Sequence, residues 1–187
     1  TKNLVSKYYG TKVTDAMLIA AKYVHSEGDE HWWVPSGTII YSAAPKTNFF
    51  TPLGGRDVYG NESRIEFDAY TFLVKSSTDA MGNIASSVND YRTLTPVMLT
   101  DPNLNRSAIE TDELGYVVKS AIMGKEGAGE GDTLADPTSR MEYDLLNWQN
   151  NKKPNYVHTF DREVHGPTNP RWQESYVYSD GGGAVIM

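Results

Sequence analysis

The sequence predicts an all-β fold, a curved antiparallel sheet of repeated hairpins, with one short helix near the N-terminus. Three observations lead to this prediction. A turn motif recurs every 22 residues, polar and apolar residues alternate between the turns, and 39% of the chain is hydrophobic against 22% charged, as in a folded protein. The repeat matters most, because repeated units bury their apolar faces against one another and so determine the architecture.

The repeat is marked by the pattern Asp-x-x-Gly-Asn and by a second Asp that follows 11 residues after the first. Asp bonds the backbone two residues on, Gly supplies a positive φ, and Asn tolerates the left-handed region. We therefore expect one set of residues to shape the turns: Asp57, Gly60, Asn61, Asp79, Gly82, Asn83, Asp101, Asn105, Asp68, Asp90 and Asp112.

Strands are expected on both sides of these turns. Ile65 and Phe67 alternate with Arg64, Glu66 and Asp68, which is the two-residue period of a half-buried strand. A second apolar stretch follows each second Asp, so one unit contains about two strands and two turns.

The chain divides into four stretches on these grounds. Residues 1–56 are expected to form a lead-in with a helix over 14–24 and the first strands. Residues 57–122 hold three repeats, residues 123–138 form a Gly/Glu-rich insertion loop, and residues 139–187 carry degenerate repeats that include a polar connector at 147–154.

Composition excludes several functions. The net charge of -7 and the lack of a Lys/Arg block argue against a nucleic-acid partner. No stretch reaches the roughly 18 apolar residues of a membrane-spanning helix. The chain has 0 cysteines, which rules out disulfides, thiolate catalysis and Cys-based zinc sites.

Three stretches invite a chemical interpretation, and a structural one explains each better. The acids and imidazoles between His25 and His31 lack a metal-binding helical spacing. The glycines of 124–131 lack the Gly-Lys-Ser/Thr of a phosphate loop and carry repelling acids. An enzyme around His158 and His165 is a third hypothesis, but the chain has no Gly-x-Ser-x-Gly elbow. We predict no catalytic residue, metal or cofactor.

Aromatic residues offer an alternative function. The chain has 12 Tyr, 4 Trp and 5 Phe, which serve most simply as cross-strand pairs. They can also form a binding platform, for which Trp32 and Trp33 are the best candidates. The alternative function is therefore a carbohydrate- or receptor-binding β-repeat module of a secreted toxin or adhesin.

The repeat core resembles the YD repeats of RHS proteins, whose pattern is roughly D-P-x-G-N, five residues, then Y-D-x-L-G-R-V-V. Residues 101–118 match it nearly throughout. The stretches 32–37, 89–92, 123–134 and 171–181 look similar to the middle region and the following repeats of the B component of tripartite insecticidal Tc toxin complexes. The resemblance covers about residues 8–187.

This resemblance implies a function of shape. In the family, the repeats coil into a hollow β-shell that the B component builds with the C component, and the shell holds a toxic effector until the A-component pore translocates it. The implied partners are the remainder of the B component, the C component with its effector and, through the complex, the A component. The implied location is extracellular.

The sequence departs from the family pattern at three places. Leu104 stands where the turn glycine is usual, and we expect it to strain that turn or change its type. Gly183-Ala184 replaces Gly-Arg, and Thr111 stands where Tyr or Phe is usual.

Overall fold

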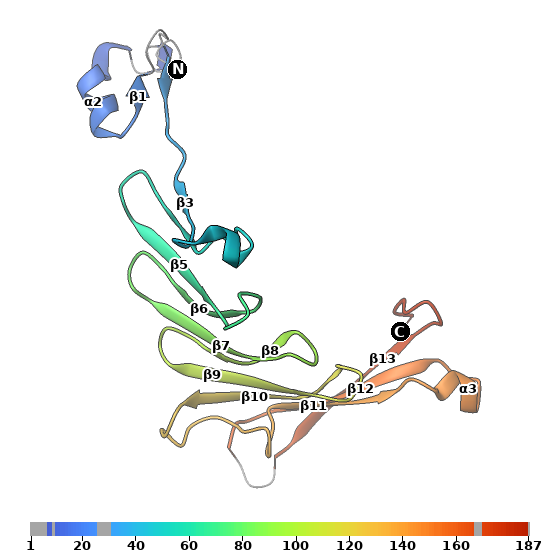
Figure 1. Cartoon of the computed structure of the whole chain (residues 1–187). Coiled ribbons are helices and arrows are strands. Elements are labelled where there is room, and N and C mark those ends of the chain that lie inside the picture. Colours follow the sequence, from blue (N-terminus) through green and yellow to red (C-terminus); the bar gives the residue numbers. More distant parts are fainter. Residues whose placement is uncertain (1–6, 9, 26–30, 167–169, 187) are drawn as a thin grey trace. The chain divides into compact units, whose positions relative to one another are not determined.

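The computed structural model describes residues 7–8, 10–25, 31–166 and 170–186 (Figure 1). Its strands are antiparallel and belong to two compact units, Thr1–Asn83 and Ile84–Met187. The prediction of an antiparallel all-β fold is confirmed. Each unit is a series of hairpins in which neighbours in the chain are also neighbours in the sheet.

The first unit contains a small hairpin and a four-stranded meander. The hairpin pairs Val24 with Trp33, and the meander runs in the order β3-β4-β5-β6. The elements are η1 (Gly10–Lys12), α2 (Asp15–Ala20), β1 (Val24–His25), β2 (Trp32–Trp33), β3 (Thr38–Ile40), η2 (Pro45–Asn48), β4 (Gly54–Arg56), β5 (Glu62–Phe67) and β6 (Val74–Thr78).

The predicted helix over 14–24 is shorter than expected. Thr14 caps its first turn, because the side-chain oxygen accepts a hydrogen bond from the backbone N–H of Met17 at 3.3 Å. The helix ends at Ala20, and Lys22 then takes a φ of 63°, which no helix continues. Val24 belongs instead to β1, and Leu18 is the buried residue of the helix.

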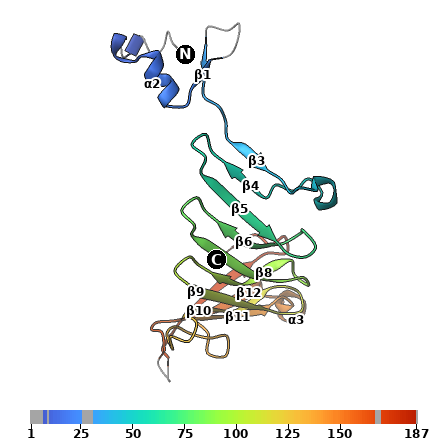
Figure 2. The same ribbon diagram turned by 60° about the vertical axis from the view of Figure 1, so that its left-hand side comes forward.

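The second unit is a seven-stranded meander. Figure 2 shows its first hairpins stacked one below the next. The elements are β7 (Ile84–Asp90), β8 (Thr95–Thr100), β9 (Asn105–Thr111), β10 (Val117–Lys125), β11 (Ser139–Asp144), α3 (Asn147–Asn151), β12 (Asn155–Arg162) and β13 (Trp172–Ser179). Among the described residues, β13 ends the strand order.

A second short helix, α3, occupies the stretch that we expected to be a polar connector. Buried Asn147 organises it: its amide donates to the carbonyl of Pro154 at 2.7 Å, and its Oδ1 accepts from Asn151 at 2.9 Å. Lys152 ends the helix with a φ of 59°. The prediction of a single helix at the N-terminus therefore missed α3. Side-chain hydrogen bonds hold this helix in place, and no apolar stripe announces it in the sequence.

The described residues bury little apolar surface. The buried hydrophobic residues are Leu18, Trp32, Ala108 and Ala121. Many large apolar side chains stay exposed, because a sheet layer without a second layer leaves both faces open. Each hairpin is therefore held more by hydrogen bonds between its strands and within its turns than by a buried apolar core. No described helix is long and apolar enough to cross a membrane.

Candidate functional site

The first-Asp turns share one hydrogen-bond pattern. Oδ1 of Asp57 accepts from the backbone N–H groups of Tyr59 (2.8 Å) and Asn61 (2.9 Å), and Oδ2 accepts from Nδ2 of Asn61 (2.7 Å). Asp79 binds the matching residues of its own turn in the same way. The Asn side chain and the backbone N–H donors hold the pKa of both carboxyls below its usual value. The carboxylates of these turns are therefore ionised, and they accept hydrogen bonds from donors of their own turn.

The third turn keeps this geometry with leucine in place of glycine. Asp101 accepts from the N–H of Asn105 at 2.8 Å and from its Nδ2 at 3.0 Å. Gly60 and Gly82 take φ values of 90° and 84°, and Leu104 takes 69° at the same position. Of the two expected outcomes, the turn type is unchanged and the leucine adopts the strained left-handed conformation.

The second-Asp turns resemble the first. Oδ1 of Asp112 accepts from the N–H of Leu114 and of Tyr116, both at 2.9 Å, and Asp68 binds its own turn similarly. Asp90 accepts from the N–H of Arg92 at 2.8 Å. The guanidinium of Arg92 also donates to the carbonyl oxygen of Asp112 at 2.7 Å, so it joins two turns that lie one repeat apart.

A further turn of this kind follows β13. Asp180 accepts from the N–H of Gly182 at 2.8 Å and of Ala184 at 2.9 Å, and Gly183 has a φ of 82°. After this turn, Val185 makes an isolated bridge to Ser179. The hydrogen-bond pattern of the repeat turns is therefore also found at Asp180, outside the three regular copies.

Trp32 and Trp33 do not form one exposed platform. They are neighbours on β2, so their indoles point to opposite sides of the strand. Trp32 is 5% exposed and packs edge-on against His25, whereas Trp33 is 51% exposed. The platform prediction is wrong for Trp32, because the β1–β2 hairpin buries it.

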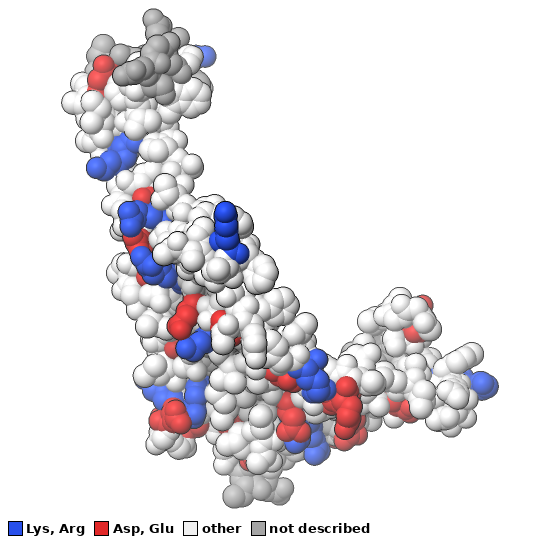
Figure 3. All heavy atoms as spheres, viewed as in Figure 1, with Lys and Arg blue, Asp and Glu red and all other residues white. Residues whose placement is uncertain are grey.

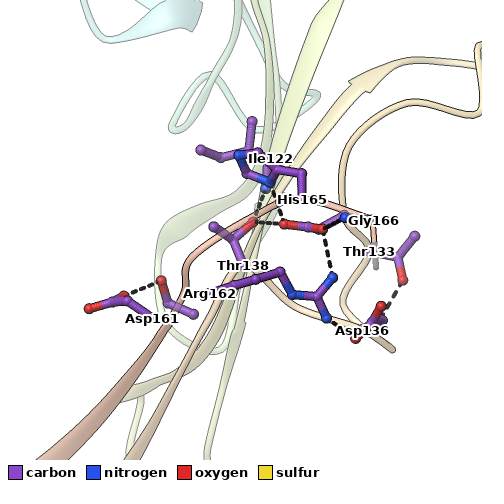
Figure 4. A network of polar contacts seen from close by, with 10 residues as sticks. Ile122, Thr133, Asp136, Thr138, Asp161, Arg162, His165 and Gly166 are labelled. Carbon is purple, nitrogen blue, oxygen red and sulfur yellow. Dashed lines mark hydrogen bonds and ion pairs between the residues drawn. The ribbon is translucent and has the colours of Figure 1, made fainter. Parts of the chain in front are cut away.

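A buried polar cluster, which we call the ionic clasp, lies at one end of β10–β12 (Figure 4). Oδ1 of Asp132 accepts from Nη1 of Arg162 at 2.9 Å, and neither side chain is exposed. Oδ2 of Asp132 accepts from the hydroxyl of Thr138 at 2.7 Å and lies 2.6 Å from Nδ1 of His165. Arg162 also pairs with Asp136, whose carboxylate is partly exposed.

The ionic clasp fixes the segment that we expected to be an insertion loop. β10 runs on to Lys125, so the loop starts later than residue 123. Beyond it, the N–H of Asp132 donates to the carbonyl of Ile122 at 2.7 Å. Burial acts to raise the pKa of Asp132, but hydrogen bonds from Thr138, His165 and Gly166 and the charge of Arg162 together keep it below its usual value.

Sequence reasoning missed the clasp, although one signal was present. Arg162 follows Tyr156, His158 and Phe160 at alternate positions of one strand, where a further apolar residue is expected. A charge at such a position needs a buried partner of opposite sign. The partner lies 30 residues earlier in the chain, and only the fold identifies it as Asp132.

The two histidines of the enzyme hypothesis bind different carboxylates. His158 Nε2 lies 3.0 Å from Glu174, and His165 Nδ1 lies 2.6 Å from Asp132. In the other candidate cluster, residues 26–30 lie outside the described part of the chain. Among the described residues, no group of three His, Cys, Asp or Glu side chains could hold a metal ion.

Aromatic side chains gather on one face of β11–β13, which we call the aromatic face. The register places His158 opposite Tyr176 and Tyr156 opposite Tyr178. His158 and Tyr176 are stacked, with ring centroids 4.0 Å apart. The members are Arg140, Glu142, Asp144, Tyr156, His158, Phe160, Trp172, Glu174, Tyr176 and Tyr178.

Comparison with known proteins finds likeness in structure. No family model matches the sequence, and no curated protein matches it. The crystal structure of TcdB2-TccC3 matches 99% of this chain with a TM-score of 0.78 and 22% identity, and the chain covers 10% of it. A second crystal structure, of TcdB2-TccC3-Cdc42, matches 99% of the chain with a TM-score of 0.73 and 18% identity, and the chain covers 13% of it.

A Tc holotoxin pore of Photorhabdus luminescens, which carries a substitution in TccC3, matches 98% of the chain with a TM-score of 0.78 and 18% identity. The chain covers 12% of it, so it spans about a tenth of the structures that it matches. At these identities the likeness is one of fold, and it agrees with the repeat that the sequence shows. The chain thus has the fold of a segment of the Tc toxin B–C components, the family that its YD-type repeats resemble.

Proposed function

We propose that this chain is a structural segment of an RHS-type β-shell that encapsulates a toxic effector in an extracellular Tc complex. One observation carries the proposal: the turns of an open, hairpin-by-hairpin sheet recur at the repeat spacing, and this arrangement matches Tc structures over 99% of the chain. Such a sheet buries its faces and edges only against further structure, so a shell is a suitable setting.

The partners under this proposal are the remainder of a B component, a C component with its effector and, through the complex, an A-component pore. The segment itself has a non-catalytic role. This interpretation is supported by the turns, whose carboxylates bind backbone N–H groups and side-chain amides of their own turn.

The burial of Trp32 weakens the carbohydrate-binding alternative, because Trp32 and Trp33 are its best candidate residues. Trp32 is buried, so a platform at this hairpin has the single exposed indole of Trp33. Replacing Trp33 by Ala tests what remains: loss of glycan binding with an unchanged fold would favour the alternative.

A chimera tests the shell proposal. The chain replaces the matching segment of TcdB2-TccC3, and the product is tested for a closed particle by electron microscopy and for protection of its enclosed cargo from added protease. We expect assembly and protection. The matched control carries Asp79→Ala and Asp101→Ala, which remove two turn carboxylates, and we expect it to leak cargo or fail to assemble.

Two results would count against the proposal. One is a chimera that folds but leaves its cargo accessible to protease. The other is the isolated chain remaining a monomer with no tendency to associate, because an open shell segment exposes sheet edges and apolar faces.

A further inference from the structure

The aromatic face is open and acidic over two of its cross-strand rows. One row contains Glu142, His158 and Tyr176, and the next contains Asp144, Tyr156 and Tyr178. Tyr176 is 47% exposed, and the carboxylates of Glu142 and Glu174 lie on the exposed surface of the same face. Figure 3 shows acidic groups gathered over β11–β13 with basic groups beside them.

The negative charge of this face acts on one of its own side chains. Partial burial raises the pKa of the Tyr176 hydroxyl first, and the nearby Glu174 and Glu142 raise it further. A cation placed beside that ring meets attraction from the same carboxylates.

The same face already binds guanidinium groups at its other end. The guanidinium carbon of Arg140 lies 4.4 Å from the ring centre of Phe160 and 5.0 Å from that of Trp172. Arg162 lies 5.4 Å from the Trp172 ring, although its charge is committed to the ionic clasp. These are the distances of cation–π contacts, and arginine stacks on aromatic rings more readily than lysine.

The two open rows contain aromatic rings and the carboxylates of Glu142 and Asp144. Glu174 lies in the adjacent row, with Phe160 and Arg140, and its carboxylate is 3.0 Å from Nε2 of His158. At the facing positions of the two open rows on β11–β13, all of which the structure describes, no lysine or arginine occurs. The charge and the rings of these rows therefore complement a guanidinium supplied by another polypeptide.

We propose that the aromatic face binds an extended, arginine-rich polypeptide segment. Alternate residues of an extended chain are about 6.6–6.8 Å apart, which is also the spacing between successive rows of side chains on one face of a sheet. Arginines at alternate positions can thus stack on successive rows and pair with the carboxylates of Glu142 and Glu174. The inference goes beyond the shell proposal and does not depend on it.

The test measures binding of labelled 12-residue peptides to the full chain by fluorescence anisotropy. One peptide alternates Arg with Ser, and two others replace each Arg by Lys or by Glu. We expect the Arg peptide to bind best, the Lys peptide to bind several-fold more weakly, and the Glu peptide not to bind.

A pair of double variants separates this surface from net charge. E142Q/E174Q removes two charges from the aromatic face and is expected to weaken binding of the Arg peptide about tenfold, because the face loses carboxylates that attract a guanidinium. The matched control, E110Q/E113Q, removes two exposed carboxylates from the β9 strand and the turn after it, and is expected to change binding less than twofold.

Variants of Tyr176 test whether its aromatic ring contributes to binding. Tyr176→Ala is expected to weaken binding several-fold and Tyr176→Phe to preserve it, because the phenylalanine ring still offers its face to a cation. Circular dichroism verifies that each variant keeps its sheet. If Tyr176→Ala unfolds, the two double variants still decide the question.

Two outcomes would overturn the proposal. Equal weakening by both double variants would assign the binding to overall charge. Binding of a neutral oligosaccharide that Tyr176→Ala abolishes and E142Q/E174Q leaves unchanged, with no binding of the Arg peptide, would make the face a glycan platform instead.

Discussion

Nη1 of Arg162 donates to Oδ1 of Asp132 at 2.9 Å, and both side chains are fully shielded from solvent. The contact joins the end of β12 to the loop between β10 and β11, two segments 30 residues apart. Charges taken out of water are costly unless they are paired, so each of these two residues depends on the other. Removing one of the two residues should therefore destabilise the fold more than replacing both of them.

Replacing Asp132 by Ala should lower the free energy of unfolding by about 3 kcal/mol, the lower end for breaking a buried pair, because the surrounding structure is thin. The double variant Asp132→Leu with Arg162→Met should recover much of this loss, since it leaves no unpaired charge. Urea denaturation measures both. Asp136→Ala is the control because its side chain is 60% exposed. A loss as large as that of Asp132→Ala would contradict the role given to the buried pair.

Replacing Leu104 by Gly should raise the free energy of unfolding by about 1 kcal/mol, because glycine adopts a positive φ without the steric cost that leucine meets. The 64% exposed side chain contributes little packing that the change would remove. The reverse substitution, Gly82→Leu, places leucine at the equivalent turn position and should lower stability by a similar amount. Thermal denaturation of both variants checks the pair, and shifts of the same sign would refute the argument.

Acid should loosen the repeat turns. The pKa values of Asp57, Asp79 and Asp101 are lower in the fold than the ordinary value of 3.8. Their contribution to stability is therefore present above pH 3.8 and is lost as the pH falls below it through the folded pKa values. Urea midpoints between pH 5 and pH 2.5 should fall.

The variant Asp79→Asn with Asp101→Asn should make this fall shallower, because an amide does not titrate. Glu130→Gln, which removes an exposed carboxylate from the loop after β10, is the control and should leave the slope unchanged. An identical slope in all three proteins would show that the turn carboxylates do not determine the response to acid.

Gly131→Ala should disrupt the loop that leads into the ionic clasp. A Cβ there would lie 2.5 Å from the carbonyl oxygen of Ile122, and the φ of 77° disfavours a side chain. Gly129→Ala is matched to it, because the φ of 68° is similar but no atom lies within 4 Å of the added Cβ. Hydrogen exchange of the amides in β10 should increase in the first variant and stay near wild type in the second. Equal effects would mean that backbone strain alone matters.

Tyr143→Phe should lower the free energy of unfolding by about 1 kcal/mol, the typical value of one hydrogen bond. The hydroxyl of Tyr143 donates to the carbonyl of Val117 at 2.8 Å and so supports the short pairing of β10 with β11. Tyr176→Phe is the control, since that ring is nearly half exposed on β13. Denaturation curves that coincide for all three proteins would contradict this role of the hydroxyl.

The sequence by itself determined the antiparallel hairpin architecture and the place of its turns. These features are local, because Asp57, Asp79 and Asp101 each bind donors within four residues of themselves. Short-range chemistry of this kind repeats wherever the motif repeats. The sequence also shows that Leu104 stands where the turn glycine is usual. Only the structure shows that the turn keeps its geometry with leucine there.

Only the tertiary structure decided the ionic clasp, the burial of Trp32 and the aromatic face. Each depends on strands brought together by hydrogen-bonded register: Asp132 meets Arg162 across 30 residues, and His158 meets Tyr176 across β12 and β13. Register and loop path determine such contacts, and no local pattern encodes both partners. The turns can therefore be predicted from the sequence, whereas the aromatic face and the buried charges form only when the hairpins pair.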